Sequence, residues 1–179
     1  MRILSKCLLP LSLLLLAAPA FAHPGHELHG AGFVDGLLHP LLGVDHLLVM
    51  LLVGVWAAQL GGKARWLVPA SFVAVMALGA SLAIGGVVLP QVEAGIAASL
   101  LIAVLLASSA LRLSLAPAML VVGMFALFHG TAHGLELPAL AQPAMFALGF
   151  LLSTAALHVA GVMLQPLLAR RSDRVAIPA

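Results

Sequence analysis

The stretch His39-Pro40-Leu41-Leu42-Gly43-Val44-Asp45-His46 opens an apolar run that continues to about Leu60. Counted from Gly32, this run is long enough to cross a bilayer. Unpaired imidazoles and carboxylates are costly to desolvate in such a segment, which predicts that these groups bind something. His, Asp and His together are typical of a metal site. The stretch therefore predicts both a membrane span and a metal-binding role.

The composition extends the membrane assignment to the whole chain. Of its 179 residues, 63% are hydrophobic and 8% are charged, and the mean hydropathy is +1.19. A soluble domain carries about 25% charged residues. We therefore predict an all-α polytopic membrane protein with room for one compact helical bundle.

The N-terminus has the pattern of a cleaved signal peptide covering residues 1–22. Arg2 and Lys6 provide the positive charge, residues 8–18 the apolar core, and Ala20-Phe21-Ala22 the small-residue cleavage site. An uncleaved anchor is the alternative. Cleavage would leave a mature chain that starts at His23 on the far side of the membrane.

Removal of this segment changes the chemistry available to the mature chain. The single cysteine, Cys7, would be lost, which excludes disulfides and thiolate ligands. Eight Lys and Arg less the two in the signal leave six, against six Asp and Glu. Any metal would then be bound by imidazole and carboxylate groups.

The mature chain is predicted to contain five spans of about 20 residues or more. They cover 32–60, 66–88, 92–111, 115–134 and 143–168, within a transmembrane domain of 32–168. A His-rich periplasmic segment, 23–31, precedes this domain and a basic cytoplasmic tail, 169–179, follows it. Because the first span contains Pro40 and Gly43, the alternative is that its opening turns form a separate half-helix or a re-entrant piece, which would make a sixth membrane element.

Charge predicts the orientation of these spans. With His23 outside, every cationic residue of the mature chain falls on the cytoplasmic side: Lys63, Arg65, Arg112, Arg170, Arg171 and Arg174. This is the positive-inside pattern. It predicts a multi-pass membrane protein whose mature N-terminus lies outside and whose C-terminus lies in the cytoplasm.

The acids and histidines are predicted to gather at the opposite, outer end. They are Glu27, Asp35, Asp45, Glu93, Glu136, His23, His26, His29, His39, His46, His129 and His133. An end that is acidic and rich in imidazole concentrates divalent cations at the outer mouth of the bundle.

A second polar motif, Phe128-His129-Gly130-Thr131-Ala132-His133-Gly134-Leu135-Glu136, lies at the outer end of the fourth span. His129 and His133 are spaced i, i+4, so a helix projects both imidazoles from one face, as in helical zinc sites. Glu136 joins this face if the helix continues. Gly130 and Gly134 form a small-residue stripe that lets another helix approach closely. The alternative is a pair of interfacial histidines bonded to backbone.

In the first motif, His39 and His46 are spaced i, i+7 and would share a face of a continuous helix. Asp45 points about 100° away from His46 on an ideal helix. It is either a direct ligand after a bend at Gly43 or an acceptor that fixes an imidazole tautomer. Pro40 is expected in a first helical turn, where its missing N–H has no cost. The alternative for the whole motif is capping and interhelical hydrogen bonds.

Four further residues are weaker candidates for metal binding. Glu93 opens the third span as a ligand or as an ordinary acid at a helix N-terminus. His158 lies past the midplane of the fifth span, as a hydrogen-bonded buried histidine or as a ligand on an exit path. His23 and His26 either capture metal at the mature terminus or belong to a flexible tail.

The two motifs resemble the signatures of HupE/UreJ proteins: His39-Pro40-x-x-Gly43-x-Asp45-His46-x-x-x-Met50 and Phe128-His129-Gly130-x-Ala132-His133-Gly134-x-Glu136. This resemblance implies a nickel permease, or in some members a cobalt permease, of the bacterial inner membrane that serves hydrogenase or urease maturation. It also implies the metal-handling residues: His39, Asp45, His46, His129, His133 and Glu136.

We therefore expect transport of a divalent cation, Ni²⁺ first and Co²⁺ next, with Zn²⁺ also accommodated by such ligands. We expect no enzyme activity, no catalytic cofactor and no nucleotide or nucleic-acid partner; a homo-oligomer stays open. The alternative from another class is an intramembrane hydrolase with a zinc ion bound by His and Asp. Haem ligation by two histidines is a third possibility, although it does not explain the carboxylates.

Overall fold

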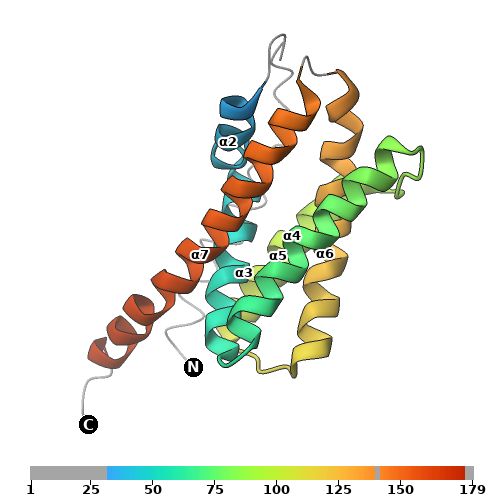
Figure 1. Cartoon of the computed structure of the whole chain (residues 1–179). Helices are drawn as coiled ribbons and strands as arrows, with labels where there is room; N and C mark the ends of the chain where they lie inside the picture. Colours follow the sequence, from blue (N-terminus) through green and yellow to red (C-terminus); the bar gives the residue numbers. More distant parts are fainter. Residues whose placement is uncertain (1–31, 140–141, 176–179) are drawn as a thin grey trace.

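The structure, a computed structural model, describes residues 32–139 and 142–175 (Figure 1). The predicted signal peptide and the N-terminal histidines His23 and His26 lie outside these residues. The helices are α2 (Phe33–Leu42), α3 (Val44–Leu60), α4 (Ala64–Ile84), α5 (Val92–Ser109), α6 (Leu115–Glu136) and α7 (Pro143–Val175), with a 3₁₀ turn at Leu137–Ala139. No strand occurs in this part of the chain, which confirms the all-α class.

Four of these helices, α4 to α7, are long and apolar enough to cross a membrane, and the bent pair α2 and α3 makes up to five spans. The spans run in alternating directions along the bundle (Figure 1), and the most extensive packing joins helices that are not consecutive: α4 with α6, α3 with α7, and α2 with α7. Short connections allow this arrangement. Between α3 and α4 the turn is made by Gly61 and Gly62, both with positive φ, which glycine adopts without steric cost.

The first predicted span is broken. α2 and α3 meet at Gly43 with a bend of 82°, so the continuous helix is wrong and the opening turns form a separate element, as the alternative predicted. Pro40 lies in the last turn of α2, where it is followed by only two helical residues. Its ring and its missing N–H disfavour further helix, and the chain restarts at Val44. The prediction that Pro40 occupies a first turn is therefore also wrong.

The other spans differ from prediction at their ends. The second helix ends at Ile84 rather than Val88, because Gly85 and Gly86 end it. α6 continues through Glu136, past the predicted end at Gly134. α7 continues through Val175, so the first residues of the predicted tail are helical.

Glycine allows α4 and α6 to pack with their backbones in contact, as the small-residue stripe predicted. A Cβ on Gly130 would lie 2.2 Å from the carbonyl oxygen of Met76, and one on Gly134 would lie 2.5 Å from that of Ala80. Neither neighbour is a side chain that can move away. This contact holds the second histidine motif, at the end of α6, against α4.

Substituting Gly130 by alanine should therefore lower the stability of the bundle by about 1–3 kcal/mol, the usual cost of overpacking. Gly123 on the same helix is a matched control, because its added Cβ would meet only the side chain of Val75 at 3.8 Å. Thermal unfolding of the detergent-purified variants measures the effect. Equal unfolding temperatures for Gly130→Ala and Gly123→Ala would contradict this packing.

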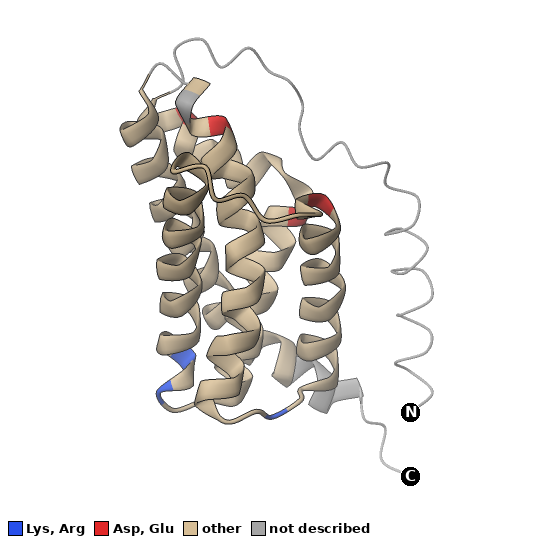
Figure 2. Cartoon of the chain, turned by 90° about the vertical axis from the view of Figure 1, so that its right-hand side faces the viewer, with Lys and Arg blue, Asp and Glu red and all other residues tan. Residues whose placement is uncertain are grey.

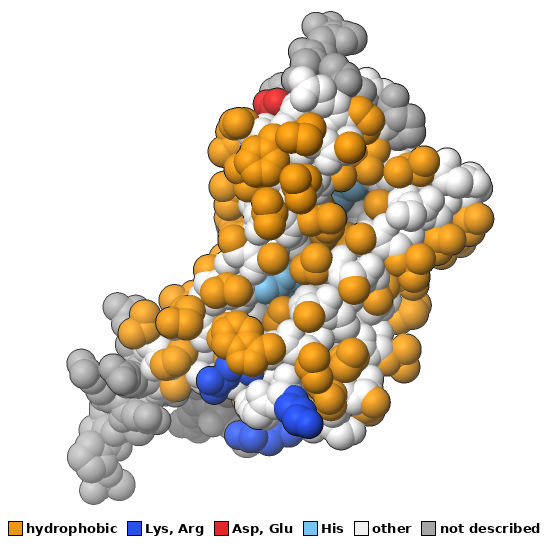
Figure 3. Space-filling view, viewed as in Figure 1, with side chains coloured by type: hydrophobic (Ala, Val, Ile, Leu, Met, Phe, Trp, Pro, Cys, Tyr) orange, Lys and Arg blue, Asp and Glu red, His pale blue; other side chains and the backbone are white. Residues whose placement is uncertain are grey.

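Charge is distributed between the two ends of the bundle (Figure 2). The cationic residues Lys63 and Arg112 lie in the connections after α3 and α5, and Arg65 lies in the first turn of α4. Glu93 and Glu136 lie where α5 begins and α6 ends. Hydrophobic side chains cover the face between these ends (Figure 3). The separation of acids from cations along the bundle is the one that the sequence predicted.

Candidate metal centre

The first polar pair comes from the start of α3. Asp45 Oδ1 lies 3.0 Å from His46 Nδ1 and also accepts the backbone N–H of His46 at 2.8 Å. The carboxylate is held at the exposed first turn of the helix, while the imidazole is buried, with 3% of its surface exposed. Since the carboxylate accepts from Nδ1–H, the other ring nitrogen, Nε2, points away from it into the bundle.

A second pair of the same kind comes from the end of α6. His133 Nδ1 lies 3.3 Å from Glu136 Oε2, one helical turn away. His133 is also buried, at 4% exposed. The continuation of α6 through Glu136 places this carboxylate on the same face as the imidazole, as expected from the spacing.

The two pairs meet through their imidazoles. His46 Nε2 and His133 Nε2 are 2.7 Å apart, although the residues are 87 positions apart in sequence. If both carboxylates accept from Nδ1–H, both facing Nε2 atoms carry lone pairs, which repel unless they share a proton or a metal cation. Two imidazole nitrogens on one ion lie about 3 Å apart when each metal–nitrogen bond is about 2.1 Å. The geometry is therefore close to that of two ligands of one metal.

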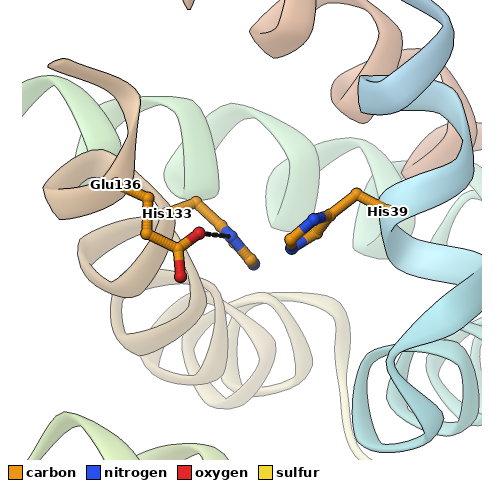
Figure 4. A group of neighbouring side chains, drawn as sticks. All are labelled: His39, His133 and Glu136. Carbon is orange, nitrogen blue, oxygen red and sulfur yellow. Dashed lines mark hydrogen bonds and ion pairs between the residues drawn. The ribbon is translucent and has the colours of Figure 1, made fainter. Parts of the chain in front are cut away.

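His39 approaches the same place from α2 (Figure 4). Single ligand atoms of His39, His133 and Glu136 all lie within 4.8 Å of one another. The ring centroids of His39 and His133 are 5.0 Å apart. The break at Gly43 turns α2 against α7, so that His39 and His46 reach the cluster from different directions. We call His39, Asp45, His46, His133 and Glu136 the outer cluster, after the end of the bundle that the sequence predicts to face outward.

Aromatic side chains of α7 close the outer cluster on one side. Phe146 and Phe150 lie 5.4 and 5.7 Å from His39, and Phe150 lies 4.3 Å from His133, between ring centroids. They exclude water from that side, which strengthens the electrostatic interactions of the polar groups.

His129 lies next to the outer cluster, with its ring 4.7 Å from that of His46. The hydroxyl of Ser99 donates to the carbonyl of Ile96 and so accepts from His129 Nε2–H at 2.9 Å. This leaves Nδ1 of His129 as a buried lone pair with no hydrogen-bond partner in the part of the chain that the structure describes. Ser99 was not among the residues identified from the sequence. Its only signal in the sequence is a hydroxyl within an otherwise apolar span, and the structure shows that this hydroxyl is fully buried.

The remaining candidates lie elsewhere. Glu93 is exposed in the first turn of α5 and is not one of the residues whose ligand atoms converge. His158 lies in the middle of α7, 1% exposed, with Phe72 between it and His129. His23 and His26 lie outside the described residues.

Comparison with known proteins gives a consistent result. A family profile described as HupE / UreJ protein matches residues 11–177. A curated relative, "Protein HupE" of Rhizobium leguminosarum bv. viciae, is 46% identical over 152 residues, which cover 85% of this chain and 80% of the relative. No solved structure matches the chain.

Proposed function

The chain belongs to the HupE/UreJ protein family, and from this premise we propose that it transports a divalent transition-metal cation across the bacterial inner membrane. The resemblance of its two motifs to that family implies nickel or cobalt as the cargo and hydrogenase or urease maturation as the purpose. We propose Ni²⁺ as the main cargo, with the ion moving from the periplasm to the cytoplasm.

One observation carries the proposal: two carboxylate–imidazole pairs, from α3 and α6, meet with their Nε2 atoms 2.7 Å apart. Carboxylates that accept from one nitrogen of a histidine orient the ring and make the other nitrogen a stronger metal ligand. Two polar pairs whose imidazoles are buried in a membrane bundle are expensive unless they serve a function. Metal binding explains both the pairing and the direction of the lone pairs.

In the proposed mechanism, the acidic end attracts a hydrated cation from the periplasm. The ion exchanges water for the imidazoles of His39, His46 and His133, while Asp45 orients His46. Glu136 orients His133 and is close enough to His39 to bind the ion directly. Imidazole and carboxylate ligands with remaining waters suit Ni²⁺ and Co²⁺ and would also hold Zn²⁺.

The family match does not support the alternative of a zinc-dependent intramembrane hydrolase. The two functions predict different products. A hydrolase cleaves its substrate in a metal-dependent reaction and moves no net metal, whereas a transporter changes the metal content of the cell.

Metal accumulation by cells tests the proposed function. Cells that produce the protein should accumulate more Ni²⁺ than cells with an empty vector, and His46→Ala should remove most of the increase. Competition by Co²⁺ and Zn²⁺ in the same assay ranks the cargo. Equal Ni²⁺ accumulation by wild type and empty vector would contradict the proposal.

A further inference from the structure

A second group of buried polar side chains lies deeper in the bundle, around His158 of α7. This residue is 15 positions after the start of the helix at Pro143, which corresponds to about 22 Å along the helix axis. Its imidazole is 1% exposed. Neither ring nitrogen makes a well-aligned hydrogen bond within the described part of the chain, although the ring interacts with the backbone of Thr154, one turn earlier.

Thr154 has the same unusual property one turn earlier on the same face of α7. It is fully buried, and its hydroxyl has no hydrogen-bond partner among the residues that the structure covers. A threonine within a helix ordinarily donates to a carbonyl of the preceding turn. Buried polar groups are nearly always paired, so unpaired ones call for a ligand, an ion or a water molecule.

At the level of His158, α7 packs directly against the backbone of α3. A Cβ on Gly54 of α3 would lie 2.2 Å from the carbonyl oxygen of His158, so the two helices touch at this level. The ring of His158 contacts Phe72 of α4, with centroids 5.0 Å apart. His158 therefore lies where α3, α4 and α7 meet, inside the bundle and away from lipid.

The inner pair is continuous with the outer cluster. Phe72 also contacts His129, at 5.9 Å between centroids, and His129 in turn contacts His46. The unpartnered Nδ1 of His129 lies on this route. Histidine also appears at two separate heights along the face in Figure 3. Imidazoles thus extend from the outer cluster toward the cationic end, with the ring of Phe72 between His129 and His158.

We infer that His158 and Thr154 form an inner binding station for the partly hydrated divalent cation, between the outer cluster and the cytoplasmic end. This inference rests on the proposed transport function and adds a second, sequential site to it. An imidazole nitrogen binds the ion directly, and the hydroxyl of Thr154 binds the ion or one of its waters. Passage through the apolar inner half of the bundle then requires a smaller loss of hydration.

Initial rates of Ni²⁺ influx test the inference, with the full chain purified and reconstituted in liposomes that contain a metal-sensitive dye. An inner station acts after capture, so its loss should lower the maximal rate and leave the half-saturating concentration nearly unchanged. We expect His158→Leu to lower the maximal rate about tenfold and Thr154→Val about threefold, which corresponds to a higher internal barrier. His158→Gln keeps a polar ligand and should be intermediate.

Ser153→Ala is the matched control, because Ser153 is a buried hydroxyl on the neighbouring face of α7; it should leave both parameters unchanged. Co²⁺ absorption spectra of each variant show whether the outer cluster still binds metal, and hence whether the protein is folded. A folded His158→Leu variant with the wild-type maximal rate would overturn the inner station alone. Absence of influx with wild type would overturn the proposed function as well.

Discussion

Substitution of His133 by alanine should reduce Ni²⁺ accumulation by cells by about 100-fold. Losing a residue that orients a metal ligand lowers metal affinity by about 10- to 100-fold, and losing the ligand itself should lower the affinity at least as much. His133 holds two interactions of the outer cluster: its Nε2 faces His46, and its Nδ1 faces Glu136. Without it the carboxylate and the second imidazole no longer share a partner. Both the capture of the ion and the arrangement of the remaining ligands should therefore fail.

Thr131→Ala is the matched control for this substitution. Thr131 is also buried, at 2% exposed, and lies on α6 between the two histidines of the motif, but it is outside the outer cluster. Its removal should change accumulation by less than about twofold, as expected for a residue that does not bind the ion. Accumulation by His133→Ala at the level of Thr131→Ala would show that the outer cluster does not capture the cargo.

Substitution of Asp45 by asparagine should weaken metal capture by about 10- to 100-fold, the usual effect of losing a carboxylate behind a metal-binding imidazole. The amide keeps the size of the side chain and can still accept the N–H of His46. It lacks the charge that makes Nε2 of His46 a strong ligand. The effect should therefore appear as a higher half-saturating Ni²⁺ concentration, with the maximal rate less affected.

Asp35→Asn controls for the loss of one negative charge at the same end of the bundle. Asp35 accepts the backbone N–H of Gly32 at the start of α2, and it is not one of the residues whose ligand atoms converge with His39. If the field of the acidic end alone set the affinity, both variants would bind equally poorly. A half-saturating concentration that is unchanged in Asp45→Asn would contradict an orienting role for Asp45.

The sequence predicted the helical class and the ends at which acids and cations gather, because both follow from long-range averages of hydropathy and charge. It also predicted that a neighbouring helix approaches Gly130 and Gly134 closely, although not that this helix is α4. Boundaries such as Val88 and Gly134 were wrong by a few residues, since short turns and caps fix the ends of helices.

The geometry of the site was less predictable. His39 and His46 approach each other through a sharp break at Gly43 and not along one helix face. The contact between His46 and His133 depends on how α3 and α6 pack, which spacing within either motif does not encode. The burial of His158 without a well-aligned hydrogen bond among the described residues likewise becomes visible only when all neighbours of α7 are in place.

The most direct test of the account is the initial rate of Ni²⁺ influx into liposomes that contain only the purified wild-type chain. The account predicts saturable influx that the double variant His46→Ala/His133→Ala abolishes, because the facing imidazoles from α3 and α6 bind the ion. Influx by that variant at the wild-type rate, or no influx by wild type above protein-free liposomes, would contradict it.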